Sequence, residues 1–230
     1  MKKTKISYIL LIAVFAAAGI FVSGAVQAQE LPYEPIITVQ EEVPGEAADA
    51  FQSLLEKLNK DGMIPDLEGQ TSYYGGHTEE KAEMDSIEWH NFTKAERFVF
   101  SANVTWASAA ERPNVYFSGC SLAFNVDDKD EDCVNASLRM DGMLYFDAVR
   151  YGNYIDFGKY YYAPGSINGA ADFTVIVDQD RAAVYVNGQR IVRKAGLPVM
   201  GDNIGLSIYS GTNKDFGIRC DWKDIFLYTW

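Results

Sequence analysis

Histidine and cysteine are both scarce in this chain of 230 residues, which contains 2 His and 3 Cys. The histidines, His77 and His90, lie in a stretch without a clear helix or strand period, and the G-x-S-x-G pattern of a nucleophile elbow is missing. Histidines with nothing nearby to orient them are more often surface residues than catalytic bases. The sequence therefore disfavours a hydrolase that uses a nucleophilic triad.

The first 28 residues have the three parts of a secretory signal peptide. Lys2, Lys3 and Lys5 are basic, residues 6–22 are almost wholly apolar, and small residues at 26 and 28 precede Gln29. No cysteine lies near this site, so the pattern does not support a lipid anchor. We expect an exported protein without stable membrane insertion after cleavage. An uncleaved N-terminal membrane anchor is the alternative, because the apolar run approaches the roughly 18 residues that span a bilayer.

Basic residues are outnumbered, with 20 Lys and Arg against 32 Asp and Glu, and the formal charge is −12. Cleavage of the leader changes this charge to −15, because the leader contains three lysines and no acids. A chain this acidic repels phosphate backbones and anionic membrane surfaces. Nucleic acid is therefore a poor candidate partner.

The segment before residue 96 predicts one helix and little other regular structure. Residues 29–45 contain three prolines among acidic residues and are interpreted as an extended spacer. The following segment has apolar residues at helical spacing and predicts an amphipathic helix that ends near Gly62. We expect residues 46–95 to form this helix and an irregular lead-in that packs on the next domain. The apolar residues of the helix are Ala48, Phe51, Leu54, Leu55 and Leu58.

From residue 96 to residue 230 the apolar residues alternate with polar ones. Phe98, Phe100 and Val104 share one face of the first segment, and the Asn187-Gly188 pair between β-rich flanks is a strong hairpin signal. About nine short strands follow at regular spacing with no helix between them. This pattern predicts an all-β domain, an antiparallel β-sandwich or jelly roll, in which each strand has one buried face.

Several of these segments resemble the concanavalin A-like lectin/glucanase superfamily, in particular its laminin-G-like and 3-keto-disaccharide-hydrolase-type bacterial members. The resemblance extends over residues 96–230 and rests on "GCSLAFNV", "FTVIVDQDRAAVYVNGQRIV" and "FGIRCDWKDIFLY". It implies a curved sheet whose concave face often takes sugars. It implies no particular activity, because one sandwich hosts lectins, hydrolases and adhesion modules.

The residues that alternate with the apolar core are mainly Ser, Thr, Asn, Tyr and Arg. Sugars need hydrogen-bond donors and acceptors together with an aromatic platform, and this set contains both. The alternative is a solvated sheet face without a ligand, since such faces are commonly rich in Ser, Thr and Asn. The ligand-binding candidates are Asn103, Asn125, Arg139, Tyr185, Tyr209 and Arg219.

The stretch "YGNYIDFGKYYYAPG", residues 151–165, is rich in tyrosine. Strand alternation would place Tyr160 and Tyr162 on one face and Tyr161 on the other. Exposed tyrosines would stack on sugar rings, whereas buried ones would fill the sandwich.

The hexapeptide "EMDSIE" spells the E-x-D-x-x-E triad of retaining glucan hydrolases. Its acids, Glu83, Asp85 and Glu88, precede the first convincing strand and lie upstream of the lectin-like region. Retaining chemistry needs two carboxyl groups held roughly 5–5.5 Å apart, which favours a rigid strand. We therefore treat them as weak catalytic candidates and expect a solvated, charged approach to the sheet.

The segment "DDKDED", residues 127–132, groups five acids in an expected hairpin loop. Calcium prefers several hard oxygen ligands, but the spacing is not that of an EF-hand and no glycine provides its sharp turn. A solvated turn without a metal cofactor is the default expectation, with Asp127, Asp130 and Asp132 as weak ligand candidates for Ca²⁺.

Three cysteines in an exported protein allow one disulfide and leave one thiol free. If the acidic loop closes a hairpin, Cys133 lies opposite residues 125–126 and too far from Cys120 for a bridge. Cys120 shares the apolar face of Leu122 and Phe124, and Cys220 also points inward. Cys133 instead shares the polar face of Asn135 and Ser137. We therefore predict a Cys120–Cys220 disulfide.

Together these patterns favour an exported, lectin-like β-sandwich that binds carbohydrate without catalysis. The first alternative is a glycoside hydrolase, either glucanase-like or resembling the 3-keto-disaccharide hydrolases. The second is a structural or adhesion module with protein partners. A large exposed apolar patch would distinguish such a module from a sugar-binding protein. An enzyme requires two carboxylates that converge in a cleft, while a binding protein requires aromatic and amide side chains there instead.

Overall fold

The computed structural model describes residues 37–40, 42–129 and 131–230. The leader, most of the proline-containing spacer and Asp130 lie outside the described residues. Among the described residues, no helix is long and apolar enough to span a bilayer.

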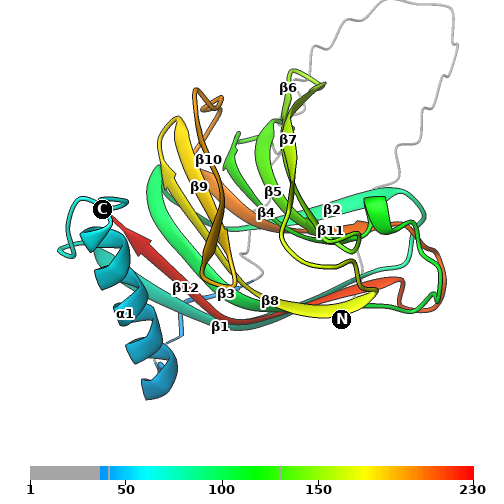
Figure 1. Ribbon diagram of the computed structural model, residues 1–230. Coiled ribbons are helices and arrows are strands. Elements are labelled where there is room, and N and C mark those ends of the chain that lie inside the picture. The colour runs from blue at the N-terminus through cyan, green and yellow to red at the C-terminus, as the bar shows by residue number, and fades with distance from the viewer. Residues whose placement is uncertain (1–36, 41, 130) are drawn as a thin grey trace, which may run out of the picture. The chain divides into compact units, whose positions relative to one another are not determined.

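The described chain forms one α-helix, one short 3₁₀ helix and twelve strands, and the strands build two sheets of six (Figure 1). Sheet A has the order β1-β12-β3-β8-β9-β10, and sheet B has the order β2-β11-β4-β5-β6-β7. The elements are α1 (Gly45–Lys60), β1 (Gln70–Lys81), β2 (Ser86–Lys94), β3 (Arg97–Ser108), η1 (Val115–Phe117), β4 (Gly119–Val126), β5 (Cys133–Arg139), β6 (Met143–Arg150), β7 (Asn153–Tyr161), β8 (Asn168–Asp178), β9 (Arg181–Val186), β10 (Gln189–Ala195), β11 (Asn203–Ser210) and β12 (Ile218–Thr229).

The predicted antiparallel sandwich is confirmed, and its core lies between the two sheets. Phe98, Phe100 and Trp222 of sheet A meet Phe124 and Phe146 of sheet B, and all five side chains are fully buried. Alternation along each strand directs these residues to one face, so the apolar period of two in the sequence becomes a continuous core. The Asn187-Gly188 turn joins β9 to β10 as the hairpin signal predicts.

The sandwich begins earlier in the chain than the sequence pattern predicts. The sequence pattern predicts irregular structure for residues 70–94, but most of them form β1 and β2, the edge strands of sheets A and B. The apolar alternation is hidden because charged residues occupy inward-facing positions near the turn between these strands. Register shifts around Gly75 interrupt β1 further. The charged and polar residues of this edge are His77, Glu79, Lys81, Glu88 and His90.

The two histidines therefore differ from the expectation of surface residues in an irregular segment. The His77 imidazole is only 20% exposed and its Nε2 lies 3.7 Å from a carboxylate oxygen of Glu79. The His90 Nε2 lies 3.3 Å from a carboxylate oxygen of Glu88. Each histidine is partly buried at the sandwich edge beside a glutamate.

The predicted disulfide is confirmed, because Cys120 of β4 and Cys220 of β12 are bonded across the core with their Cα atoms 5.8 Å apart. The third cysteine, Cys133, is free and buried. It lies on the outer face of sheet B beside Ala123 and Val126. The two bonded cysteines link the two sheets, so the disulfide spans the sandwich.

Helix α1 packs on part of the outer face of sheet A (Figure 1). Phe51 stacks on Phe226 of β12 with ring centroids 4.6 Å apart, and Leu55 and Leu58 are buried against the same face. The helix therefore covers part of the outer face of sheet A. On the outer face of sheet B, the short helix η1 places the Phe117 ring 5.6 Å from the Tyr209 ring.

Candidate functional site

The structure divides the predicted ligand-binding residues between two surfaces. Asn103, Tyr185 and Arg219 lie on sheet A, whereas Arg139 and Tyr209 lie together on the outer face of sheet B. Asn125 lies near the end of β4 with φ 52°, and its amide donates to the carbonyl oxygens of Gln179 and Pro198. The residues therefore do not form one site.

The three candidates on sheet A are each engaged with neighbouring side chains. The Asn103 amide donates to the Asp224 carboxylate at 3.3 Å. The Arg219 guanidinium pairs with Glu80 at 2.6 Å and lies over the Phe216 ring. Tyr185 packs against the apolar cluster under α1.

Small residues occupy the centre of the outer face of sheet B, and large ones occupy its sides. The Ser137 hydroxyl donates to Ser121 Oγ at 2.9 Å, and the Ser207 hydroxyl donates to the Ser121 carbonyl at 3.4 Å. The strand register aligns these serines with aromatic residues on either side. The complete row, from β2 to β7, is Trp89, Ser207, Ser121, Ser137, Tyr145 and Lys159.

Arg139 is the central charged residue of this face. Its guanidinium carbon lies 3.3 Å from the centroid of the Tyr209 ring, with the rings of Tyr145 and Phe117 at 5.3 Å and 5.7 Å. The side chain is 4% exposed. Within the described residues, its Nε and Nη1 have no hydrogen-bond acceptor. A buried charged donor without an acceptor is costly, so these N–H groups are strong candidates for ligand contact.

Acceptors lie on the same face as this cation. The Asn135 amide donates to Asp147 Oδ1 at 3.2 Å, and the Tyr154 phenol donates to Asp147 Oδ2 at 3.2 Å. Burial raises the pKa of Asp147, although Asn135, Arg139 and Tyr154 each act in the opposite direction. Guanidinium, amide, carboxylate and phenol groups thus occur together on adjacent strands.

The phenols of this face stay protonated at neutral pH. Burial raises the pKa of Tyr209 to about 12, and burial together with the hydrogen bond to Asp141 raises the pKa of Tyr145 to about 12. Burial and the Asp147 charge also raise the pKa of Tyr154. Each phenol can therefore act as a neutral hydrogen-bond donor.

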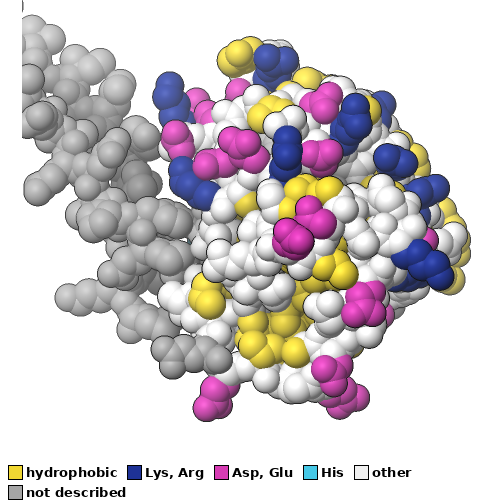
Figure 2. Space-filling model, turned by 90° about the vertical axis from the view of Figure 1, so that its left-hand side faces the viewer, with side chains coloured by type: hydrophobic (Ala, Val, Ile, Leu, Met, Phe, Trp, Pro, Cys, Tyr) yellow, Lys and Arg dark blue, Asp and Glu magenta, His cyan; other side chains and the backbone are white. Residues whose placement is uncertain are grey.

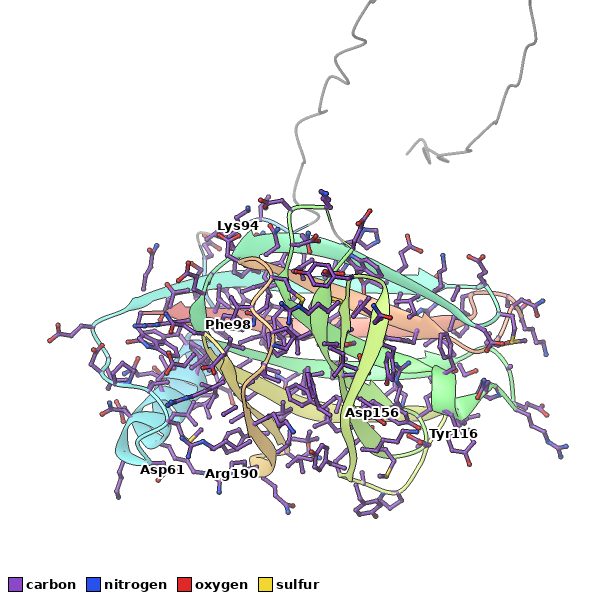
Figure 3. All side chains as sticks on the ribbon, turned by 90° about the horizontal axis from the view of Figure 1, so that it is seen from above. Asp61, Lys94, Phe98, Tyr116, Asp156 and Arg190 are labelled. Atoms are coloured by element: carbon purple, nitrogen blue, oxygen red, sulfur yellow. A yellow bond between two sulfur atoms is a disulfide. The ribbon has the colours of Figure 1, made fainter. Side chains whose placement is uncertain are left out.

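Exposed tyrosines border this polar surface. The side of the molecule that carries sheet B is shown in Figure 3, where Tyr116 of η1 and Asp156 of β7 are labelled. Tyr154 and Tyr161 of β7 are 62% and 65% exposed, and Tyr151 and Tyr116 are also exposed. Tyr160 and Tyr162 instead pack against the core, so they share one face, as the alternation predicts. We define the Arg139 surface as Arg139, Tyr209, Tyr145, Asn135, Asp147, Tyr154 and Tyr161.

Sequence reasoning missed Tyr145 and Asp147 as members of this surface, and it named Tyr154 only as part of the tyrosine-rich stretch 151–165. Tyr145 and Asp147 alternate with Leu144, Phe146 and Ala148 in β6, so strand alternation alone could have found them. Tyr154 carries no such signal, because β7 contains a register shift opposite Phe146 and Asp147.

The acids of "EMDSIE" lie in the turn between β1 and β2 and on the edge strand β2. The Lys81 ammonium bridges Glu83 at 3.0 Å and Glu88 at 2.9 Å. Burial opposes ionisation of Glu88, but the hydrogen bond and charge of Lys81 outweigh it and lower the Glu88 pKa. Asp85 accepts a hydrogen bond from the Asn114 amide. These acids are engaged in ion pairs and a turn, away from the Arg139 surface.

The acidic loop joins β4 to β5 as a hairpin. Asp127 Oδ1 accepts hydrogen bonds from the backbone N–H groups of Glu131 and Asp132, and Asp132 Oδ1 accepts one from Tyr151. The described residues contain no group of three or more His, Cys, Asp or Glu placed to hold a metal ion. Because Asp130 is outside the described residues, the expectation of a solvated turn, with Ca²⁺ as the weak alternative, stays untested.

No family model and no curated protein matches this chain. Among solved structures, the carbohydrate-binding module CBM66 from Bacillus subtilis has a TM-score of 0.53 at 11% identity, over 69% of this chain and 95% of that one. A Bacillus subtilis protein of unknown function with a galectin-like fold gives 0.48 at 11% identity, over 70% of this chain and 89% of that one. The Bacillus licheniformis β-glucanase gives 0.45 at 10% identity, over 63% and 71%. With its two six-stranded antiparallel sheets, the described chain therefore has the concanavalin A-like jelly-roll fold that its sequence resembles.

Proposed function

We propose that this protein is an exported, non-catalytic carbohydrate-binding protein whose site is the Arg139 surface. The observation that carries the proposal is the buried Arg139 guanidinium, which has unused donors on the same sheet face as the Asp147 carboxylate, with exposed tyrosines at the border. The fold of the carbohydrate-binding module from Bacillus subtilis agrees with this proposal.

The side chains favour an uncharged sugar over a polyanion. Each sugar hydroxyl both donates and accepts, and the surface offers donors at Arg139 and Asn135 and an acceptor at Asp147. Cations at Arg139 and Lys159 are accompanied by carboxylates at Asp141, Asp147 and Asp156, so the surface has no excess of positive charge for a polyanion. The exposed faces of Tyr154 and Tyr161 suit the apolar C–H faces of a pyranose or furanose ring.

Export is supported by two features of the chain. The leader has the composition of a signal peptide, and the Cys120–Cys220 disulfide is the kind of bond that persists in oxidising compartments. Mass spectrometry of the protein secreted by an expressing bacterium should give a mature chain that begins at Gln29. A chain that retains residues 1–28 in the membrane fraction would contradict cleavage.

One observation favours glycoside hydrolysis as a second candidate function. Asp147 and Asp156 are register partners on β6 and β7, and burial raises the pKa of Asp147 while Asp156 is exposed. A carboxyl pair in different environments is the arrangement that glycosidases use for an acid and its partner. Release of reducing sugar that is abolished in both Asp147→Asn and Asp156→Asn would favour this second function over simple binding.

The binding proposal is tested with a glycan array followed by calorimetric titration of the glycans that bind. We expect saturable binding that Tyr154→Ala and Tyr161→Ala each weaken about fivefold to a hundredfold, from the 1–3 kcal/mol that stacking on an aromatic ring contributes. Tyr161→Ala should leave the melting temperature close to that of the unchanged chain, because this side chain is exposed. Tyr154→Ala should also lower the melting temperature, because it removes the phenol that donates to the buried Asp147 carboxylate. Arg219→Met on sheet A is the matched control and should bind normally. Absence of saturable binding across neutral glycans would reject the proposal.

A further inference from the structure

Helix α1 covers only part of the outer face of sheet A, because the character of this face changes along its strands. Under the C-terminal half of the helix the face is apolar, with Val99 on β3 and Ile176 on β8. Two residues further along the same face, Ser101 and Thr174 follow, and their hydroxyls hydrogen-bond to each other at 3.2 Å. The apolar side of the helix therefore lies above a polar area of the sheet at Ser101 and Thr174.

This mismatch leaves a groove of 270 Å³ between the helix and the sheet. Ala47, Ala50 and Leu54 of α1 form its apolar wall, above the stacked rings of Phe51 and Phe226. The polar wall consists of Asn103, Asp172 and Asp224, together with the two hydroxyls. Figure 2, which faces the side of the molecule where α1 lies in Figure 1, shows apolar side chains gathered among acidic ones. The groove thus has one apolar wall and one acidic wall.

The strand register explains why two carboxylates meet in this groove. Asn103 of β3 is the register partner of Asp172 on β8. On its other side, a bulge in β12 follows Lys223 and gives Asp224 a φ of 50°. The extra residue of a bulge re-aims side chains, and Asp224 accepts hydrogen bonds here from the Asn103 amide and, at 3.5 Å, from the Tyr73 phenol. Asn103 therefore stands between the two acids.

In the described part of the chain, neither of these two carboxylates has a basic partner within ion-pair distance. Among the salt bridges of the described residues, none involves Asp172 or Asp224. Lys223, the register partner of Asn103, is exposed and forms no salt bridge there either. Glu46, in the first turn of α1, adds another negative charge to this end of the helix. Two carboxylates that face an apolar wall attract a cation more strongly than they would in open water.

We propose that this groove binds a small organic cation with an apolar body, namely a primary or quaternary amine that carries an aryl or alkyl group. The ammonium group would lie between Asp172 and Asp224, and the apolar group would lie against Ala50, Leu54 and Phe51. The overall charge of −12 attracts such cations over a distance. Because the groove is on sheet A, this site is separate from the Arg139 surface on sheet B and does not depend on the proposed function.

The test uses calorimetric titration of the purified chain with three probes of similar shape and different charge. Phenethylamine should bind saturably, the neutral 2-phenylethanol should bind roughly tenfold more weakly, and the anionic 3-phenylpropionate should show no saturable binding. Increasing the salt concentration should weaken the binding of the amine and leave the binding of the alcohol unchanged. Equal binding of the amine and the alcohol would overturn the proposal, because the carboxylates would then contribute nothing.

Variants separate the two walls of the groove. Asp172→Asn and Asp224→Asn should each weaken amine binding roughly threefold, and the double variant roughly tenfold. Ala50→Leu keeps both carboxylates and places another good helix former in α1, but it fills the groove and should abolish binding. Asp156→Asn on sheet B is the control with the same charge change and should bind the amine normally. Unchanged binding in Ala50→Leu, with a normal melting temperature, would overturn the proposal.

Discussion

The guanidinium of Arg139 on β5 touches the Tyr209 ring on β11, although β4 lies between these strands in sheet B. The residue of β4 in register with both is Gly119. Because Gly119 has no side chain, the Tyr209 ring can extend across β4 and meet Arg139. The central contact of the candidate site thus depends on a glycine that contributes no functional group of its own.

Gly119→Ala should destabilise the protein. A Cβ at this position would lie 2.0 Å from the Leu138 carbonyl oxygen and 3.0 Å from the Arg139 Cα, and neither backbone atom can move away cheaply. We expect a loss of about 3 kcal/mol in the free energy of unfolding, measured with urea, and a loss of glycan binding. Gly45→Ala is the control, because its Cβ meets nothing within 4 Å and should leave stability within about 1 kcal/mol of the unchanged chain.

Arg139→Met should remove binding without loss of stability. Methionine keeps much of the apolar stem that packs between the rings, while it removes a buried charge with two unbonded donors. Replacement of buried charged groups by apolar ones is often neutral or stabilising. We expect the urea midpoint to stay the same or increase while glycan affinity falls at least tenfold. A large loss of stability would show that Arg139 is structural rather than a ligand-binding residue.

The disulfide and the free cysteine should respond differently to reagents. Cys120 and Cys220 are separated by 100 residues, so reduction should lower the free energy of unfolding by about 4–5 kcal/mol on the chain-entropy model. Burial raises the pKa of Cys133 to about 11, so the thiol stays protonated in the folded protein even near pH 9. Mass spectrometry after iodoacetamide treatment should find no alkylation of the native chain and one alkylated site after unfolding without reductant. Alkylation of the native chain would contradict the burial of Cys133.

Asp147 and Glu88 should contribute to stability with opposite dependence on pH. The pKa of Asp147 is raised by burial, so the folded state holds this proton more tightly and stability falls as pH rises through the unfolded and then the folded pKa. The pKa of Glu88 is lowered, so its stabilising effect is present above the unfolded pKa and is lost as pH falls through the folded pKa.

Substitution of each carboxylate separates the two effects. Asp147→Asn should therefore raise the free energy of unfolding at pH 7 relative to the unchanged chain, and this gain should shrink towards pH 4 as the wild-type carboxyl becomes protonated. Glu88→Gln should lower the free energy of unfolding at pH 7, and in acid its free energy of unfolding should approach that of the unchanged chain. Urea titrations at several pH values measure both differences. The same sign for both variants at pH 7 would contradict the assignment.

Strand alternation is a local property, and for this reason it predicts the buried face of most strands in the sandwich. Phe98, Phe124 and Leu206 face the core because each lies in a strand whose neighbours alternate with it. The same reasoning gave the inward positions of Cys120 and Cys220 and so the disulfide. It failed for β1 and β2, where inward positions such as those of Glu79 and His90 carry polar groups. His90 is partly exposed beside Glu88, whereas Glu79 is buried with His77 Nε2 3.7 Å away, so polar groups replace apolar ones at these inward positions and the pattern is lost.

By itself, the sequence determined which residues alternate, where the helix forms and which cysteines bond, because these depend on periodicity along the chain. Only the tertiary structure decided which polar residues act together. Asn103 and Arg139 both occupy polar positions in strands whose residues alternate between apolar and polar. In the structure, Asn103 lies beside Asp224 on sheet A, whereas Arg139 lies against the Tyr209 ring on sheet B. Strand order and register bring distant segments into contact, and neither is encoded in the spacing of any single segment.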